Sequence, residues 1–427
     1  MNIQLKDQEE ILEKTKPFNL PKQLFVKAYK LVKANAGSAG VDKQSLADFD
    51  KNLKDNLYKL WNRMSSGSYF PPPVKAVPIP KKTGGERILG VPTVGDRICQ
   101  MVVKLVFEPG VESIFLEDSY GYRPNKSALD AIGVTRKRCW QYDWVLEFDI
   151  KGLFDNIPHE LLMKAVRKHT QEKWVILYIE RWLKAPMQRA DGSIVARTYG
   201  TSQGGVISPV LSNLFLHYVY DKWMQRNHTV TPWCRYADDG LAHCKTEQEA
   251  QALLVSLKAR FEECGLELHP TKTKIVYCKD GSRKGKYPNK SFDFLGYTFR
   301  ARMCKNTKRQ SLFINFTPAV SKLALKSMQA TTRRYNIRNR TDLKLGDIAK
   351  WYNPVLQGWI NYYGKYTRSG LYPMLRHFNL TLVAWAMRKY RRLRNRKTWA
   401  AKFMERIAED NPYLFAHWRC GMLGAFA

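Results

Sequence analysis

The sequence predicts an α+β fold in which short antiparallel strands carry carboxylates and helices surround them. Asp149 directly follows the apolar run 144–148, a pattern typical of a buried strand. Asp238 and Asp239 follow the run 233–236 and precede a glycine and two apolar residues. That pattern predicts two short strands joined by a tight turn, with both acids at its tip. Because an Asp-Asp pair alone is usually a solvated turn, its meaning depends on the rest of the chain.

Composition narrows the class of protein. At 427 residues the chain can hold two or three domains, and 44% hydrophobic with 12% aromatic residues favours a folded protein. Its 71 basic and 38 acidic residues leave a net charge of +33, which favours a polyanionic partner. No apolar run reaches the roughly 18 residues of a membrane span, and the N-terminus resembles neither a secretory nor a lipidation signal. We therefore expect a nucleic-acid partner, no membrane, and a cytoplasmic location that leaves association with the nucleoid open.

The eight cysteines show no metal-binding spacing. No Cys-x-x-Cys pair or histidine cluster is present, so the sequence indicates neither a zinc finger nor a disulfide framework. Reduced, mostly buried thiols are expected, as in a cytosolic protein.

Helical patterns dominate both ends of the chain. Residues 1–70 include an amphipathic helix whose basic side carries Lys30, although such a lysine can equally belong to a solvated face. From Pro318 onward there are 21 Lys and Arg against five Asp and Glu, which indicates a basic helical segment. It contains the basic run 388–397, where aromatic and apolar insertions favour a folded helix over a disordered tail. Between these ends, the patterns predict a two-stranded hairpin at 74–80 and 87–92, then helices over 96–141 with a break at 121–124.

Between the acids lies the segment Thr-Ser-Gln-Gly-Gly-Val-Ile-Ser-Pro at 201–209, followed by an apolar helical stretch. The order of Asp149, this segment and Tyr-Ala-Asp-Asp resembles the palm of reverse transcriptases, most closely those encoded by bacterial group II introns. Further segments match the family in order, namely Ile-Pro-Lys at 79–81 with Arg87, Gly-Tyr-Arg-Pro at 121–124, Pro-Thr-Lys-Thr at 270–273, Phe-Leu-Gly-Tyr at 294–297, and the maturase-like stretch 353–363.

The resemblance implies a right-hand polymerase with helical fingers, an antiparallel palm sheet and a helical thumb. The expected divisions are an RNA-binding N-terminal extension at 1–70, fingers at 71–141, a palm at 142–300 and a thumb or maturase region at 301–427. Fingers and palm together would form the reverse transcriptase domain, about 60–300. Many relatives continue into a His/Cys-rich endonuclease domain, and the resemblance is to the form that lacks it.

For the reaction, the resemblance implies two Mg²⁺ ions, with Mn²⁺ able to substitute. Asp149 and Asp238 would bridge both ions, Asp239 would lie at the periphery, and Ile150 would offer its backbone carbonyl. Three carboxylates suit Mg²⁺ because it keeps several waters and binds a few carboxylates together with substrate phosphates.

The resemblance also implies the residues that bind a dNTP. Lys81 and Arg87 would grip the triphosphate, and Gln203 would touch the incoming nucleotide or its pairing partner. Phe154 would abut the sugar C2′ and exclude a 2′-hydroxyl, unless it is simply a core residue. Lys272 would lie near the leaving pyrophosphate as a general acid, unless it is an ordinary surface lysine.

The resemblance also implies a template contact at Lys75. The basic charge pattern predicts further nucleic-acid contacts at Lys30 and, in the basic run, at Arg391, Arg392 and Arg394. The aromatic residues Trp351, Trp359 and Tyr363 are expected to be core residues of the thumb rather than base platforms.

The expected function is RNA-templated DNA synthesis, with binding of structured group II intron RNA, assistance to splicing and retromobility. Its partners would be an RNA template, a DNA or RNA primer, dNTPs, the intron RNA and a DNA target. Two alternatives stay open: a splicing-only RNA-binding maturase, and a group II-like enzyme that serves DNA repair or phage defence. A retron or diversity-generating enzyme fits the 201–209 segment and the long basic thumb less well, and a viral RNA polymerase fits Phe154 less well. The oligomeric state is not predicted.

Overall fold

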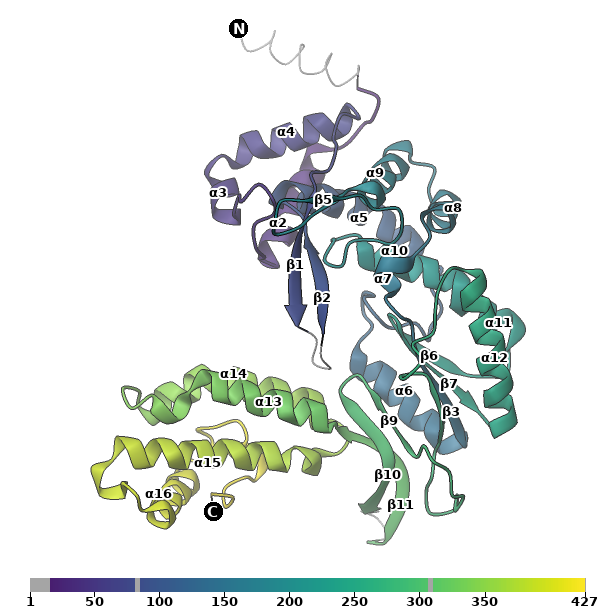
Figure 1. The fold of residues 1–427 in the computed structure, drawn as a ribbon. Helices are drawn as coiled ribbons and strands as arrows, with labels where there is room; N and C mark the ends of the chain where they lie inside the picture. The colour runs from purple at the N-terminus through teal and green to yellow at the C-terminus, as the bar shows by residue number, and fades with distance from the viewer. Residues whose placement is uncertain (1–15, 81–84, 306–309, 427) are drawn as a thin grey trace. The chain divides into compact units, whose positions relative to one another are not determined.

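The computed structural model describes residues 16–80, 85–305 and 310–426. Contacts divide the chain into two compact units, each of which is described by itself (Figure 1). Unit 1 runs to Ser127 and adds Phe148–Ala242 and Gln251–Thr273. Unit 2 combines Ala128–Glu147, His243–Ala250 and the chain from Lys274 onward. Mixed helices and strands in both units confirm the predicted α+β class.

Unit 1 holds helices around two groups of strands. Its helices are α2 (Lys22–Ala34), α3 (Leu46–Lys51), α4 (Leu53–Ser65), α5 (Val94–Glu112), α7 (Leu153–Asn156), α8 (His159–His169), α9 (Lys173–Lys184), α10 (Ser208–Leu216), the π-helical turn η1 (His217–Asp221), α11 (Lys222–Asn227) and part of α12 (Glu247–Glu263). Its strands are β1 (Val74–Pro80), β2 (Glu86–Val91), β4 (Met187–Gln188), β5 (Ile194–Val195), β6 (Trp233–Tyr236) and most of β7 (Asp239–Cys244). Strands β1 and β2 confirm the predicted hairpin, and they belong to a sheet of order β2-β1-β4-β5.

Unit 2 combines a small sheet with a helical bundle. Its strands are β3 (Trp144–Asp149) up to Glu147, β8 (Lys274–Tyr277), β9 (Ser291–Phe294), β10 (Tyr297–Lys305) and β11 (Leu312–Val320). Its helices are α6 (Ala128–Gln141), α13 (Lys322–Tyr335), α14 (Leu345–Tyr363), α15 (Tyr372–Lys389) and α16 (Lys397–Asp410), with short 3₁₀ turns η2 (Ile337–Asn339), η3 (Arg368–Leu371), η4 (Arg391–Leu393) and η5 (Trp418–Cys420). The sheet order is β11-β10-β9, and the remaining strands of the chain have the order β6-β7-β3-β8.

Two predicted strand patterns appear as expected around the acids. The apolar run before Asp149 forms β3, which pairs antiparallel with β8. The run 233–236 forms β6, which pairs antiparallel with β7 so that Tyr236 faces Asp239. Only Ala237 and Asp238 remain for the turn, and Ala237 takes a left-handed backbone with φ of 56°. A two-residue hairpin favours that conformation, even though it strains a residue with a side chain.

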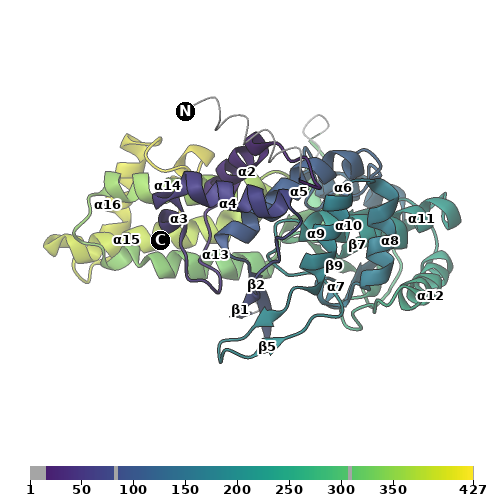
Figure 2. The same ribbon diagram turned by 90° about the horizontal axis from the view of Figure 1, so that it is seen from above.

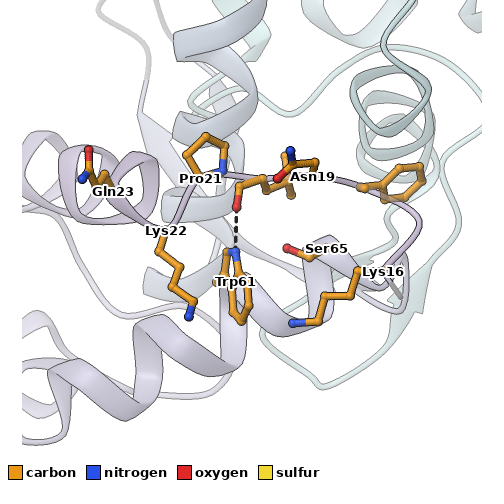
Figure 3. A pocket seen from close by; sticks show the side chains of 9 residues that line it. Lys16, Asn19, Pro21, Lys22, Gln23, Trp61 and Ser65 are labelled. Carbon is orange, nitrogen blue, oxygen red and sulfur yellow. Dashed lines mark hydrogen bonds between the residues drawn. The ribbon is translucent and has the colours of Figure 1, made fainter. Parts of the chain in front are cut away.

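The buried side chain of Trp61, in α4, connects the N-terminal helices of unit 1. Its indole N–H donates to the backbone oxygen of Leu20 at 2.7 Å, and the ammonium groups of Lys16 and Lys22 lie 3.4 and 4.5 Å from the ring centroid (Figure 3). Cation–π attraction therefore adds to the hydrogen bond that joins the start of α2 to α4.

The helices of unit 2 share one apolar core. Helix α15 packs along α13 and α16, as Figure 1 shows and Figure 2 shows from above. Trp385 and Trp418 are almost fully buried in this core. Trp359 and Tyr363 pack partly against it, as predicted, but Trp351 is 41% exposed.

The basic run 388–397 is not the helix that its apolar insertions predicted. Helix α15 ends at Lys389, a 3₁₀ turn follows, and α16 begins at Lys397, so the run forms a corner between two helices. Leu393 fixes this corner because its side chain is buried while Arg391, Arg392 and Arg394 remain exposed. Within the described chain, no helix combines the length and apolar character that crossing a bilayer requires.

Candidate active site

Unit 1 brings Asp149 close to the turn that carries Asp238. Asp149 ends β3 and is only 9% exposed, and Asp238 is half-buried. Burial raises the pKa of Asp238, and the negative charge of Asp149 raises it further. Strand β3, which Asp149 ends, is the neighbour in the sheet of β7, which begins directly after Asp238. Asp239 follows directly as the first residue of β7.

Lys272 supplies the positive charge at this site. Its ammonium donates to Oδ2 of Asp149 at 2.7 Å. Partial burial acts to lower the pKa of Lys272, but the hydrogen bond to Asp149 and the charges of all three acids outweigh it, so the pKa is raised. The sequence placed Lys272 near the reaction only through a resemblance, and the structure adds a direct contact with an acid.

The donor set fits a hard divalent cation. Carboxylate oxygens are the ligands that Mg²⁺ prefers. Burial and then the charge of Asp149 raise the pKa of Asp238, and a bound cation would favour its charged form. In the described part of the chain, no three His, Cys, Asp or Glu side chains are arranged to enclose a metal ion.

A buried ion pair stabilises the turn between β6 and β7 that carries Asp238. Arg235 of β6 and Asp221 of η1 are fully buried and form two parallel hydrogen bonds of 2.7 Å each. The same guanidinium donates to the backbone oxygen of Ala237 at 3.2 Å, to Asn213 at 3.1 Å and to Ser119 at 2.8 Å. The rigid fork of Arg235 therefore links the turn before Asp238 to three other parts of the chain, namely η1, α10 and the segment that holds Ser119.

Gly121 and Tyr122 lie against the same turn, and sequence reasoning gave neither of them a role at the site. A Cβ on Gly121 would lie 2.4 Å from the backbone nitrogen of Ala237, so only glycine allows this approach. Tyr122 is half exposed with φ of 59°, and its pKa is raised by burial and then by Asp238. The signal was the Gly-Tyr-Arg-Pro segment, whose glycine the sequence could not connect with a turn over 100 residues away.

Phe154 lies at the edge of this site and is not a core residue. Its ring is half-buried and meets the ring of Tyr122 edge-on, with centroids 6.5 Å apart. Phe154 lies in α7, the short helix that follows Asp149 closely in the chain. The plain core interpretation left open by the sequence therefore loses support, although the role of Phe154 in sugar selection stays a prediction.

The segment 201–205 is hydrogen-bonded to β2 on one side and to α7, which holds Phe154, on the other. The Thr201 amide donates to the Phe154 oxygen at 2.6 Å, and the Gly90 amide donates to the Gln203 oxygen at 2.7 Å. A Cβ on Gly204 would lie 2.6 Å from the Gly90 oxygen, which explains why a glycine is needed there. The side chain of Gln203 donates to Asp155 at 3.0 Å.

The structure places three more of the predicted residues, Arg87, Lys75 and Lys30, whose roles stay predictions. Arg87 is exposed on β2, opposite Ile79 of β1, and its positive charge acts to lower the pKa of Tyr122. Lys75 on β1 and Lys30 on α2 are also exposed. Lys81 lies outside the described residues.

Comparison with known proteins gives the family. The family model for reverse transcriptase (RNA-dependent DNA polymerase) matches residues 79–299, slightly more than half of the chain. The chain belongs to the reverse transcriptase family. A second model, for the maturase-specific domain of group II introns, matches residues 325–404. The enzyme is an RNA-directed DNA polymerase with a maturase domain, as the sequence predicted.

Several curated proteins are similar to this reverse transcriptase. The Escherichia coli K12 protein YkfC is 33% identical over an aligned length of 288 residues, gaps included, and the match covers 58% of this chain and 74% of that protein. The group II intron-encoded protein LtrA of Lactococcus lactis subsp. cremoris is 25% identical over an aligned length of 444 residues, gaps included, and the match covers 83% of this chain and 71% of that protein. The putative COX1/OXI3 intron 1 protein of Saccharomyces cerevisiae is 26% identical and covers 67% of this chain but 34% of its own length.

Proposed function

We propose that this reverse transcriptase adds dNTPs to a primer at Asp149 and Asp238, by the two-metal chemistry of a right-hand polymerase. The observation that carries the proposal is geometric: Asp149 ends β3, Asp238 directly precedes β7, its neighbour in the sheet, and the Lys272 ammonium is bound to Asp149. We further propose that the N-terminal extension, fingers, palm and thumb follow the divisions expected from the sequence.

The two carboxylates, with Asp239 at the periphery and the Ile150 carbonyl, would hold Mg²⁺, or Mn²⁺ in its place. When bound, such ions polarise the primer 3′-oxygen and neutralise charge on the transferred phosphate. The protein's own part is positioning: Arg235 fixes the turn that carries Asp238, and Gly121 allows another segment to pack against that turn.

The nucleotide would lie between the acids, Phe154 and the 201–205 segment. Arg87, and Lys81 with it, would bind the triphosphate, and Gln203 would contact the nucleotide or its partner. The edge-on contact with Tyr122 would hold the Phe154 ring in a fixed place, where it can exclude a 2′-hydroxyl.

Phe154→Val is expected to raise the use of rNTPs relative to dNTPs by about ten- to a hundredfold, because the smaller side chain leaves room for the extra hydroxyl. The measurement is kcat/KM for dTTP and for UTP on one RNA template. Phe292→Val, which shortens an aromatic side chain buried in unit 2, is the matched control. Unchanged selectivity in a folded, active Phe154→Val protein would reject the gate.

Lys272→Met is expected to lower kcat by about a hundredfold, and Lys272→Arg should stay well below the wild-type rate, because arginine keeps the positive charge beside Asp149 but gives up its proton too reluctantly to act as a general acid. Single-turnover extension at saturating dNTP measures both variants. An ordinary surface lysine predicts wild-type kcat for Lys272→Met, and that result would remove Lys272 from the site. Lys258→Met, in an exposed ion pair on α12, controls for lost surface charge.

For the maturase domain, we propose binding of structured intron RNA, which supports splicing and retromobility into a DNA target. The exposed Arg391, Arg392 and Arg394 at the α15–α16 corner would contact RNA phosphates, with Lys30 and Lys75 as further contacts. A splicing assay with the RNA that flanks the gene tests this role. Wild-type splicing by a triple Arg→Gln variant of the corner would contradict it.

A further inference from the structure

A polar cavity in unit 2 lies between strand β10 and the turn η3, just before α15. Its volume is about 420 Å³. Four lining residues come from β10 and three from the region of η3, namely Arg300, Ala301, Arg302, Met303, Thr367, Ser369 and Gly370. Two of the seven carry a positive charge and none carries a negative one, so the cavity has a positive lining.

Arg302 is held in place by uncharged groups. Its Nε donates to the Thr317 oxygen at 3.3 Å, and its Nη2 donates to the Thr298 oxygen at 3.1 Å. A guanidinium has five N–H donors, so these two bonds fix its orientation and leave others for a ligand. Burial lowers the pKa of Arg302, and the neighbouring charge of Arg300 lowers it further. No carboxylate in the described chain forms an ion pair with either arginine.

The other side of the cavity supplies a hydroxyl on a fixed turn. Thr367 donates to the Pro318 oxygen at 2.8 Å and so ties the turn to β11. A Cβ on Gly370 would lie 3.3 Å from side-chain atoms of Ala319 and Val320, which shows how closely the turn approaches that strand. Ser369 is exposed, and among the described residues its hydroxyl has no hydrogen-bond partner.

We propose that this cavity binds a phosphodiester group of a nucleic-acid backbone. Two arginines and a hydroxyl match the non-bridging oxygens of one phosphate, and a guanidinium is the side chain best suited to such a pair of oxygens. The proposal rests on the proposed function, since it adds one defined backbone contact to a protein that handles nucleic acid. The phosphate can come from a primer–template duplex or from folded intron RNA, and the two sources are separated by the test.

Arg300→Gln is the decisive variant, because Arg300 is exposed and the fold does not depend on its side chain. We expect binding to weaken about tenfold at low salt, and the slope of log K against log salt to fall by about one. Fluorescence anisotropy over a salt series measures both, once with an RNA–DNA primer–template and once with a folded intron RNA. A reduced slope with only one of them identifies the source of the phosphate. A wild-type slope with both overturns the proposal.

Two further variants distinguish specific phosphate binding in the cavity from general electrostatic attraction between the basic protein and nucleic acid. The variant Lys284→Gln/Lys286→Gln removes two exposed charges elsewhere in unit 2. If each of these charges lowers the slope of log K against log salt as much as Arg300→Gln does, the proposal is overturned. Arg302→Lys keeps the charge but loses the fork, so we expect weaker binding with nearly the wild-type slope. Wild-type affinity for Arg302→Lys would also count against a built site.

Failure of the cavity and failure of the proposed function give different results. Asp238→Asn removes an acid but leaves the cavity intact, so it should bind with the wild-type slope even where it extends no primer. If the wild-type protein fails to extend primers, the proposed function is refuted. The effect of Arg300→Gln on the slope of log K against log salt still shows whether the cavity binds a phosphate.

Discussion

Asp238→Asn is expected to lower the rate of primer extension by about a thousandfold or more. The amide is nearly isosteric but carries no charge, so the site loses a carboxylate that would hold the metal ions. Metal stabilisation of the reacting phosphate is worth several kcal/mol, and each 1.36 kcal/mol corresponds to about tenfold in rate. Single-turnover extension in Mg²⁺, with the primer–template saturating, gives the rate of the chemical step.

The matched control is Asp410→Asn, which makes the same change at an exposed position at the end of α16. It should extend at the wild-type rate. Because burial and the charge of Asp149 both oppose ionisation of Asp238, the neutral amide should not destabilise the fold. A folded Asp238→Asn protein with the wild-type rate would remove this residue from the metal site.

Arg235→Leu is expected to lower the free energy of unfolding by about 3–5 kcal/mol, because it leaves the fully buried Asp221 carboxylate without its partner. Urea unfolding followed by tryptophan fluorescence measures the change. Lys184→Met breaks an exposed ion pair with Glu180 and should cost no more than about 1 kcal/mol. Equal losses for the two variants would contradict the account of Arg235.

The double variant Arg235→Leu/Asp221→Leu refines this test. Removing both charges avoids a lone buried carboxylate, so the double variant should be more stable than Arg235→Leu alone. It should still unfold more easily than the wild type, since the bonds from Arg235 to Ala237, Asn213 and Ser119 are lost as well. A double variant less stable than the single one would show that Asp221 has another stabilising role.

Local patterns were sufficient to predict the strands of the site. The apolar run before Asp149 and the two runs around Asp238 are short and strongly patterned, and each forms the strand that the sequence predicts. The family, the polymerase activity and the maturase domain are confirmed as well. The strands depend on residues that are close together in the chain, whereas the family follows from the order of several motifs along it.

The features that the sequence did not give are long-range. No local pattern predicts the role of Arg235, because this role depends on hydrogen bonds to Asp221, Asn213 and Ser119 that form only in the folded protein. Tyr122 is similar, since its place beside the acids depends on a backbone with positive φ. The prediction of one helix over the basic run 388–397 was wrong for another reason. The chain forms a 3₁₀ turn at Arg391–Leu393 that buries the Leu393 side chain, and this burial outweighs the helical pattern of the run.

The most direct measurement is primer extension on poly(rA)/oligo(dT) with dTTP and Mg²⁺, comparing the wild type with Asp238→Ala/Asp239→Ala. The account predicts extension by the wild type and none by the double variant, with both proteins folded and both bound to the substrate. Equal extension by the two proteins would contradict the assignment of the acids. If neither protein extends while both bind structured RNA tightly, the polymerase site itself would be refuted.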